Sequence, residues 1–143
     1  MAEASRPFPH TPLTLLLDAN VFLTVLAKGW HLHQIIESVV TESYRLVCPK
    51  VVREELERLV GQERHAGNAV RLAQALAEEL DEGLYLTPEE RRRPVDDQLL
   101  ALAQALAPRV VVVTQDRGLR QKLRWANIPV LLMGPGQGRL LGP

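Results

Sequence analysis

The sequence predicts an α/β fold, a three-layer α/β/α sandwich around a central five-stranded parallel sheet. Short apolar runs of strand length alternate along the chain with stretches of helical periodicity, which is typical of successive β-α-β units. The strand-length runs are apolar throughout rather than at every second residue. Such runs are expected of strands that are covered by helices on both faces of a parallel sheet.

In the first half of the chain, residues 13–17 form the first apolar run, and Asp18 ends it. Helical periodicity follows at 21–27 and 32–40, and the second strand is expected at 44–48. Residues 51–60 and 68–80 then repeat apolar residues three and four positions apart, which predicts two further helices.

In the second half, a short apolar run at 84–86 predicts the third strand, and 96–107 has the period of a helix. The valine-rich run at 110–114 is the fourth strand, 119–126 the last helix and 130–133 the fifth strand. Residues 1–12, which contain three prolines, are expected to form an irregular leader, and the glycine-rich residues 134–143 a flexible tail. The folded domain is therefore predicted at 13–133.

Composition places the chain among soluble, single-domain proteins. Its 143 residues are 46% apolar and 24% charged, which suits one compact core. The apolar run at 13–27 is interrupted by Asp18 and Asn20 and follows no basic segment, so no membrane span or targeting signal is predicted. Cys48 is the only cysteine, which excludes an internal disulfide and a cysteine zinc cage and fits a cytoplasmic protein.

The charge balance gives no sign of a strongly basic nucleic-acid binder. Seventeen basic residues offset seventeen acidic ones, so no global positive field draws a polyanion toward the protein. Fourteen of the basic residues are arginine, the better bidentate ligand for phosphate. Neutral charge therefore weighs against a nucleic-acid substrate without excluding one.

Two aspartates are predicted at one edge of the sheet. Asp18 follows the first strand and Asp116 comes just after the fourth. Ligands of open parallel sheets bind outside the carboxyl ends of the strands, so these acids are candidate site residues. Aspartate after a strand is also a common helix N-cap, and the sequence leaves that alternative open.

Two more acids fall on the apolar faces of predicted helices. At 100° per residue, Glu55 lies within the apolar stripe of its helix, whereas Glu54 points away from it. Asp96 likewise shares a side with Leu100, and Asp97 lies beside polar Gln104. A carboxylate that faces the core is costly unless it is paired or bound to a metal. Helix capping remains an alternative for Asp96 and Asp97.

Four acids from separate elements suit a site that holds divalent cations against a phosphodiester. Hard cations such as Mg²⁺ take oxygen ligands, and a water molecule that they activate can act as the nucleophile. No Ser/His/Asp or Cys/His arrangement competes. The four histidines have no evident partner in the sequence and are expected at the surface; they are His10, His31, His33 and His65.

The motifs that carry these acids resemble, in the same order, those of PIN-domain ribonucleases. They are Leu17-Asp18-Ala19-Asn20, Val51-Val52-Arg53-Glu54-Glu55-Leu56, Asp96-Asp97-Gln98-Leu99-Leu100-Ala101 and Val113-Thr114-Gln115-Asp116-Arg117-Gly118-Leu119. The resemblance spans about 13–133. It implies a PIN-like fold, a Mg²⁺ or Mn²⁺ cofactor and hydrolysis of RNA.

The resemblance also assigns residues. It makes Asp18, Glu55, Asp96 and Asp116 the metal-binding, catalytic acids, with Asp97 as a further candidate ligand and Asn20 and Thr114 as supporting polar positions. Many relatives have another acid two positions after the last aspartate. This chain has Gly118 there, so a second metal ion is expected to bind weakly.

The sequence resembles the Fcf-type ribosomal RNA processing branch of the family more than ordinary VapC toxins. An antitoxin protein and a second copy of the chain are further partners that the resemblance leaves open. A haloacid-dehalogenase-type phosphohydrolase is disfavoured, because that chemistry needs an acid where this chain has Asn20. The main alternative is a non-catalytic PIN-like module that binds RNA or protein.

A basic strip is predicted beside the acids. Arg117, Arg120 and Arg124 follow Asp116, and two of them share a helix face four residues apart. RNA phosphates are the expected ligand, although such a strip can also be an ordinary solvated helix face. The run Arg91-Arg92-Arg93 before Asp96 has the same two interpretations.

Overall fold

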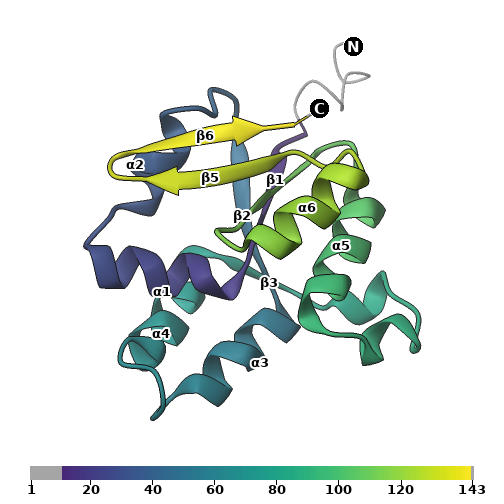
Figure 1. Ribbon diagram of the computed structural model, residues 1–143, viewed down its shortest axis with the longest axis horizontal. Helices are drawn as coiled ribbons and strands as arrows, with labels where there is room; N and C mark the ends of the chain where they lie inside the picture. The colour runs from purple at the N-terminus through teal and green to yellow at the C-terminus, as the bar shows by residue number, and fades with distance from the viewer. Residues whose placement is uncertain (1–10, 143) are drawn as a thin grey trace, which may run out of the picture.

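The computed structural model describes residues 11–142 (Figure 1). Most of the predicted leader lies outside these residues. The elements in chain order are β1 (Leu13–Leu17), α1 (Ala19–Lys28), α2 (Leu32–Glu37), β2 (Tyr44–Pro49), α3 (Lys50–Leu59), α4 (Ala66–Leu76), β3 (Glu78–Leu80), the 3₁₀ helices η3 (Glu82–Leu84) and η4 (Glu90–Arg92), α5 (Val95–Leu106), β4 (Val110–Val113), α6 (Arg117–Trp125), β5 (Val130–Gly134) and β6 (Gln137–Leu141).

The strands form one sheet in the order β3-β2-β1-β4-β5-β6. The first five are parallel, and β6 runs antiparallel to β5. The predicted α/β fold with a parallel sheet is therefore confirmed. Helices α1, α3 and α4 contact one another, as do α5 and α6, and the helices flank the sheet (Figure 1).

The order of the strands fixes where a ligand can bind. The chain builds the sheet from β1 through β2 to β3 in one direction, and then continues on the other side of β1 with β4 and β5. Leu17 pairs with Val113 at the carboxyl ends of β1 and β4. The strand order reverses at this pair, and such a switch point is where open α/β sheets bind ligands.

The core lies along the two central strands. All residues of β1 and β4 are buried, and the helices add Phe22, Leu56 and Leu119, which are fully covered. Each such side chain stabilises the fold by roughly 1.5–3 kcal/mol relative to an exposed one. The central strands that lead into Asp18 and Asp116 are therefore the most firmly packed part of the sheet.

The third strand is not at the predicted position. Residues 78–80 form β3 at the edge of the sheet and pair with β2, whereas 84–86 belong to the end of η3 and the turn after it. An edge strand needs few apolar residues, and Glu78 and Glu79 are exposed. Leu84, whose apolar side chain prompted the prediction, is 79% exposed. The helix predicted at 68–80 ends at Leu76, because the last three of those residues form β3.

The tail predicted to be flexible forms a sixth strand. Gly136 adopts a left-handed φ of 69° in the turn between β5 and β6, which glycine allows without strain. At Gly138 an added Cβ would lie 3.0 Å from a methyl group of Leu131 and 3.1 Å from the carbonyl oxygen of Ile35. Glycine here permits close packing of β6, rather than marking a loose segment. Within 11–142, no helix is both long and apolar enough to cross a membrane.

Candidate active site

The acid at the end of β1 is buried at the switch point of the sheet. Asp18 is only 5% exposed, and its backbone N–H donates to the carbonyl oxygen of Val113, 3.1 Å away, at the end of β4. Its Oδ1 accepts a hydrogen bond from the backbone N–H of Ala19 at 2.7 Å. Asp18 thus caps α1, as one interpretation of the sequence expected, and it also faces the neighbouring strand.

Two polar side chains hold the second oxygen of this carboxylate. Thr114 Oγ1 donates to Asp18 Oδ2 at 2.8 Å, and Asn20 Nδ2 donates to the same oxygen at 3.2 Å. Burial raises the pKa of Asp18, the hydrogen bonds from Thr114 and Ala19 oppose the rise, and the charges of Asp96 and Asp116 add to it. The carboxylate is therefore oriented firmly but is surrounded by other negative charge.

The loop after β4 is tied to the start of α1. The N–H of Asp116 donates to Thr114 Oγ1 at 3.1 Å, and the N–H of Gln115 donates to Asn20 Oδ1 at 3.2 Å. The Gln115 side chain exchanges two hydrogen bonds with the backbone of Met133 in β5. Asp116 Oδ1 accepts from the N–H of Leu119 at 2.8 Å and so caps α6. These bonds fix the two aspartates relative to each other.

The α3 acid that the helical projection selected faces the same site. Glu55 is partly buried, whereas Glu54 is exposed. Burial raises the pKa of Glu55, and the nearby charges of Asp18 and Asp96 raise it further, while Arg58 lowers it. The two acids that raise its pKa come from other elements, so the inward-facing side of α3 points toward the switch point.

A buried acid that sequence reasoning missed secures the start of α3. Glu82 is 4% exposed, and its Oε1 accepts a hydrogen bond from the N–H of Val51 at 2.9 Å. This bond caps the first turn of α3 from a segment 31 residues away, where Pro49 has no capping side chain. Glu82 thereby helps to set the position of the helix that carries Glu55.

The adjacent aspartates of α5 have different surroundings. Burial raises the pKa of Asp96, with further contributions from Asp116 and Asp97, and Lys122 lowers it. Asp97 instead pairs with Lys122, with 2.8 Å between Oδ1 and Nζ. Neither aspartate caps α5 through a side-chain hydrogen bond within the described chain. Asp96 therefore belongs with the acidic group, and Asp97 makes an ion pair at its rim.

The four acids that the sequence singled out are linked by their effects on pKa values. Asp96 and Asp116 raise the pKa of Asp18, Asp18 and Asp96 raise that of Glu55, and Asp116 raises that of Asp96. Within 11–142, none of the four acids forms an ion pair with a basic side chain. We call Asp18, Glu55, Asp96 and Asp116 the acidic cluster. Oxygen ligands with uncompensated charge suit a hard divalent cation.

The acidic cluster is not oriented as a finished ligand set. Among the described residues, no three acidic, histidine or cysteine side chains converge on one point where an ion could bind. Electrostatic influence extends over several ångströms, whereas ligation of Mg²⁺ needs oxygens about 2.1 Å from the ion. Glu55 and Asp96 have no side-chain hydrogen bonds within 11–142, so both can rotate toward a cation. The donor chemistry therefore fits a metal, with side-chain rotation needed to bind it.

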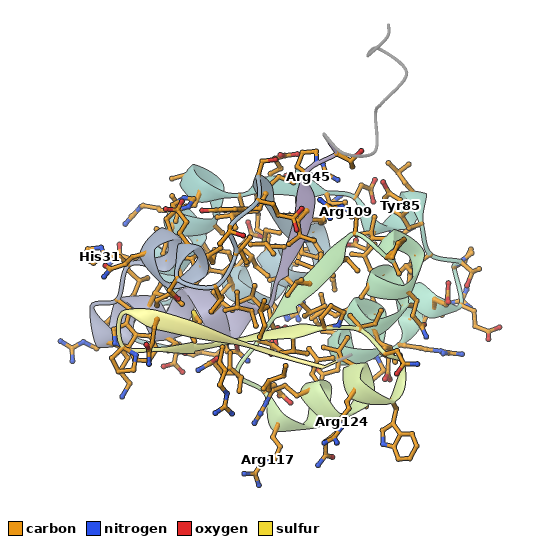
Figure 2. The ribbon with its side chains drawn as sticks, turned by 90° about the horizontal axis from the view of Figure 1, so that it is seen from above. His31, Arg45, Tyr85, Arg109, Arg117 and Arg124 are labelled. Atoms are coloured by element: carbon orange, nitrogen blue, oxygen red, sulfur yellow. The ribbon has the colours of Figure 1, made fainter. Side chains whose placement is uncertain are left out.

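The predicted basic residues lie beside this cluster. Arg117, Arg120 and Arg124 are all on α6, and Figure 2 shows Arg117 and Arg124 projecting outward from the same side of that helix. The exposed run of arginines before α5 lies in and next to η4. Of the histidines, His33 is exposed but has a partner, because its Nδ1 is 2.7 Å from Tyr44 Oη. His10 lies outside the described residues.

The raised pKa of Glu55 has a measurable consequence for stability. A carboxyl group whose pKa is higher in the folded than in the unfolded chain destabilises the fold as pH rises from about 4.5 through the raised folded value. We therefore expect metal-free Glu55→Gln to be more stable than the wild type at pH 7, by less than about 1 kcal/mol for this partly exposed group, and so to unfold at a higher temperature.

The difference should shrink as the pH is lowered to 4.5, because Glu55 is then protonated in more of the wild-type molecules. Thermal unfolding followed by circular dichroism in EDTA measures it. Glu54→Gln is the matched control and should show no such pH-dependent gain. A stabilisation by Glu55→Gln that is the same at both pH values would contradict the raised pKa of Glu55.

Comparison with known proteins agrees with this architecture. A family model described as a PIN-like domain matches residues 15–134, which is most of the chain. No curated protein matches significantly. The solved structure of the PIN domain endonuclease Utp24 is 20% identical, with a TM-score of 0.76 over 92% of this chain and 93% of that one.

Two VapBC structures share the fold at lower similarity. VapBC2 from Rickettsia felis, bound to a DNA fragment from its promoter, is 14% identical, with a TM-score of 0.59 over 85% of this chain and 99% of the other. VapBC-1 from nontypeable Haemophilus influenzae is 19% identical, with a TM-score of 0.54 over 82% and 96%. Since the family model covers the β1 to β5 region that carries the acidic cluster, this chain belongs to the PIN-like domain family.

Proposed function

We propose that this protein is a divalent-metal-dependent endoribonuclease that hydrolyses phosphodiester bonds of RNA. The proposed metal ligands are Asp18, Glu55, Asp96 and Asp116. The observation that carries the proposal is the electrostatic coupling of these four acids, which come from four different elements and form no ion pair within the described chain. Mg²⁺ or Mn²⁺ bound there supplies Lewis-acid activation of water and neutralises charge on the phosphate.

The side chains have distinct tasks in this scheme. Asp18, the most buried acid, has its carboxylate oriented by Thr114 and Asn20, so it offers a fixed point of attachment. Glu55 on α3 and Asp96 on α5 would complete the ligand set by side-chain rotation. Asp97 holds Lys122 at the rim, where the ammonium group can approach a substrate phosphate.

The alternative of a non-catalytic binding module is less consistent with this site. Burial and mutual repulsion raise the pKa of three of the acids, which is a cost in stability that a disused site has no reason to keep. Solved structures with this fold include an endonuclease and VapBC proteins. We propose RNA as the substrate in either setting and treat an antitoxin, or a second copy of the chain, as a partner to be sought by co-purification.

Removal of divalent cations should abolish cleavage. Purified protein incubated with a 5′-labelled single-stranded RNA should yield shorter fragments in Mg²⁺ or Mn²⁺ and none in EDTA, with cleavage restored when excess Mn²⁺ is added back. The metal dependence follows because the acidic cluster contains no alternative nucleophile. Undiminished cleavage in EDTA would exclude the proposed mechanism. Binding of RNA without cleavage in any metal would favour the non-catalytic module.

A further inference from the structure

A groove runs along α6 on the side that faces β5 and β6. Its volume is about 490 Å³. Basic or polar residues of α6 form one wall, and residues around β5 and β6 form the other. The lining consists of Arg117, Arg120, Gln121, Arg124, Ile128, Val130, Leu141 and Gly142. We call this the α6 groove.

The arginines of the α6 groove carry uncompensated charge. Within 11–142, neither Arg117, Arg120 nor Arg124 forms an ion pair, whereas other arginines, such as Arg53 and Arg45, are paired with glutamates. The Nε atom of Arg120 is also buried without a hydrogen-bond partner in the described chain; the same is true of Arg53 and Arg109, but the guanidinium groups of those two pair with glutamates. A buried donor without an acceptor is unfavourable, so this position favours an anionic ligand that supplies one.

The spacing of the three arginines suits a chain of anions rather than a single ion. With a rise of about 1.5 Å per residue, Arg117 and Arg124 lie roughly 10 Å apart along the axis of α6, with Arg120 between them. Arg117, at one end of the α6 groove, directly follows Asp116 of the acidic cluster in the chain. A strand that leaves the groove at Arg117 is therefore expected to pass close to Asp116.

Two further features favour a single-stranded nucleic acid over an acidic peptide. The wall opposite the arginines is apolar, with Ile128, Val130 and Leu141, of which the partly exposed Leu141 can contact ribose or a base face. At the end of the same helix, next to Arg124, the Trp125 side chain is 89% exposed. Arginines combined with an exposed aromatic ring are typical of sites that hold a phosphate backbone while unpaired bases stack.

We propose that the α6 groove holds single-stranded RNA on one side of the scissile phosphate. The three guanidinium groups contact successive phosphates, and the indole of Trp125 stacks on an unpaired base beyond them. This inference rests on the proposed function in one respect, namely that the bound strand leads to the acidic cluster. The groove itself acts without metal, so binding and cleavage can be tested separately.

The test measures binding of a fluorescent, unstructured oligouridine by anisotropy in EDTA, over a series of salt concentrations. Three phosphate contacts predict a slope of log K against log salt near −2, at about −0.7 per phosphate. Arg120→Gln/Arg124→Gln should weaken binding at least about tenfold and reduce the slope to near −0.7. Trp125→Ala should weaken binding roughly tenfold with little change in slope.

Lys28→Gln/Arg64→Gln removes the same charge from exposed positions outside α6, at the end of α1 and in the turn before α4, and is the matched control. Its affinity and salt slope should stay close to wild type. If burial of Arg120 makes the first double variant fold poorly, Arg117→Gln/Arg124→Gln changes only exposed residues of α6 and should have the same effect. Equal losses of RNA affinity in the groove and control variants would overturn the proposal. So would competition by polyglutamate that displaces the labelled RNA as effectively as unlabelled RNA does.

Cleavage kinetics separate the two proposals. Groove-dependent binding in a protein that never cleaves RNA would refute the nuclease and leave the groove standing. Metal-dependent cleavage with an unchanged KM in the groove variants would refute the groove and leave the nuclease standing. If both proposals hold, the groove variants should raise KM for long RNA while affinity for Mn²⁺ stays unchanged.

Discussion

Asp18→Asn is expected to lower kcat for RNA cleavage by at least about a hundredfold. The amide keeps the size of the side chain, and its oxygen can still accept a hydrogen bond from Thr114 or Ala19, so the fold should remain intact. What is lost is the negative charge at the most buried position of the acidic cluster. Single-turnover cleavage of a labelled RNA at saturating Mn²⁺ measures the effect.

Asp81→Asn is a suitable control for this substitution. Asp81 also accepts a hydrogen bond from a backbone N–H at the start of a helix, that of Gly83 at 2.9 Å, but it is exposed and makes no contribution to the raised pKa values of the cluster. Its kcat should stay within about twofold of wild type. Full activity of Asp18→Asn, with metal dependence retained, would show that Asp18 is not part of the metal site.

The second large effect should separate two neighbouring glutamates. Glu55→Gln is expected to reduce kcat by about a hundredfold, because its carboxylate faces Asp18 and Asp96 and is proposed to bind the metal. Glu54→Gln should be nearly neutral, because Glu54 is exposed on α3. Both substitutions remove one charge from the same helix turn. A difference between their kcat values therefore reports which way the side chain points rather than the loss of net charge.

The measurement is again single-turnover cleavage, together with Mn²⁺ titration of the rate. Glu55→Gln should require more Mn²⁺ for its residual activity, and Glu54→Gln should not. Similar losses from both substitutions would mean that the helix acts through its overall charge. A larger loss from Glu54→Gln would place the metal on the other side of α3.

Central strands were predictable from the sequence because packing against helices on both faces demands continuous apolar runs. The first and fourth strands were predicted within one residue of β1 and β4. Edge strands are less covered and need no continuous apolar run. The exposed glutamates of β3 have no strand pattern of their own and are extended because they pair with β2. The glycines of the tail, which are Gly134, Gly136, Gly138 and Gly142, likewise suggested a flexible segment, since the pairing of β6 with β5 is not visible in local sequence.

In the site, too, features set by local sequence were predictable and features set by long-range contacts were not. Helical periodicity was enough to distinguish Glu55 from Glu54, because both belong to one regular helix. It could not reveal that Glu82 caps α3, since that hydrogen bond joins residues 31 positions apart. The ion pair between Lys122 and Asp97 depends equally on how α6 packs beside α5.

Direct measurement of Mn²⁺ binding tests the central claim that the acidic cluster is a metal site. Isothermal titration calorimetry at neutral pH, without RNA, should show saturable binding to the wild type. Binding should be lost or strongly weakened in Asp18→Asn and Asp96→Asn and retained in Glu54→Gln. Binding to Asp18→Asn and Asp96→Asn with wild-type affinity would show that the metal lies elsewhere and would contradict the account.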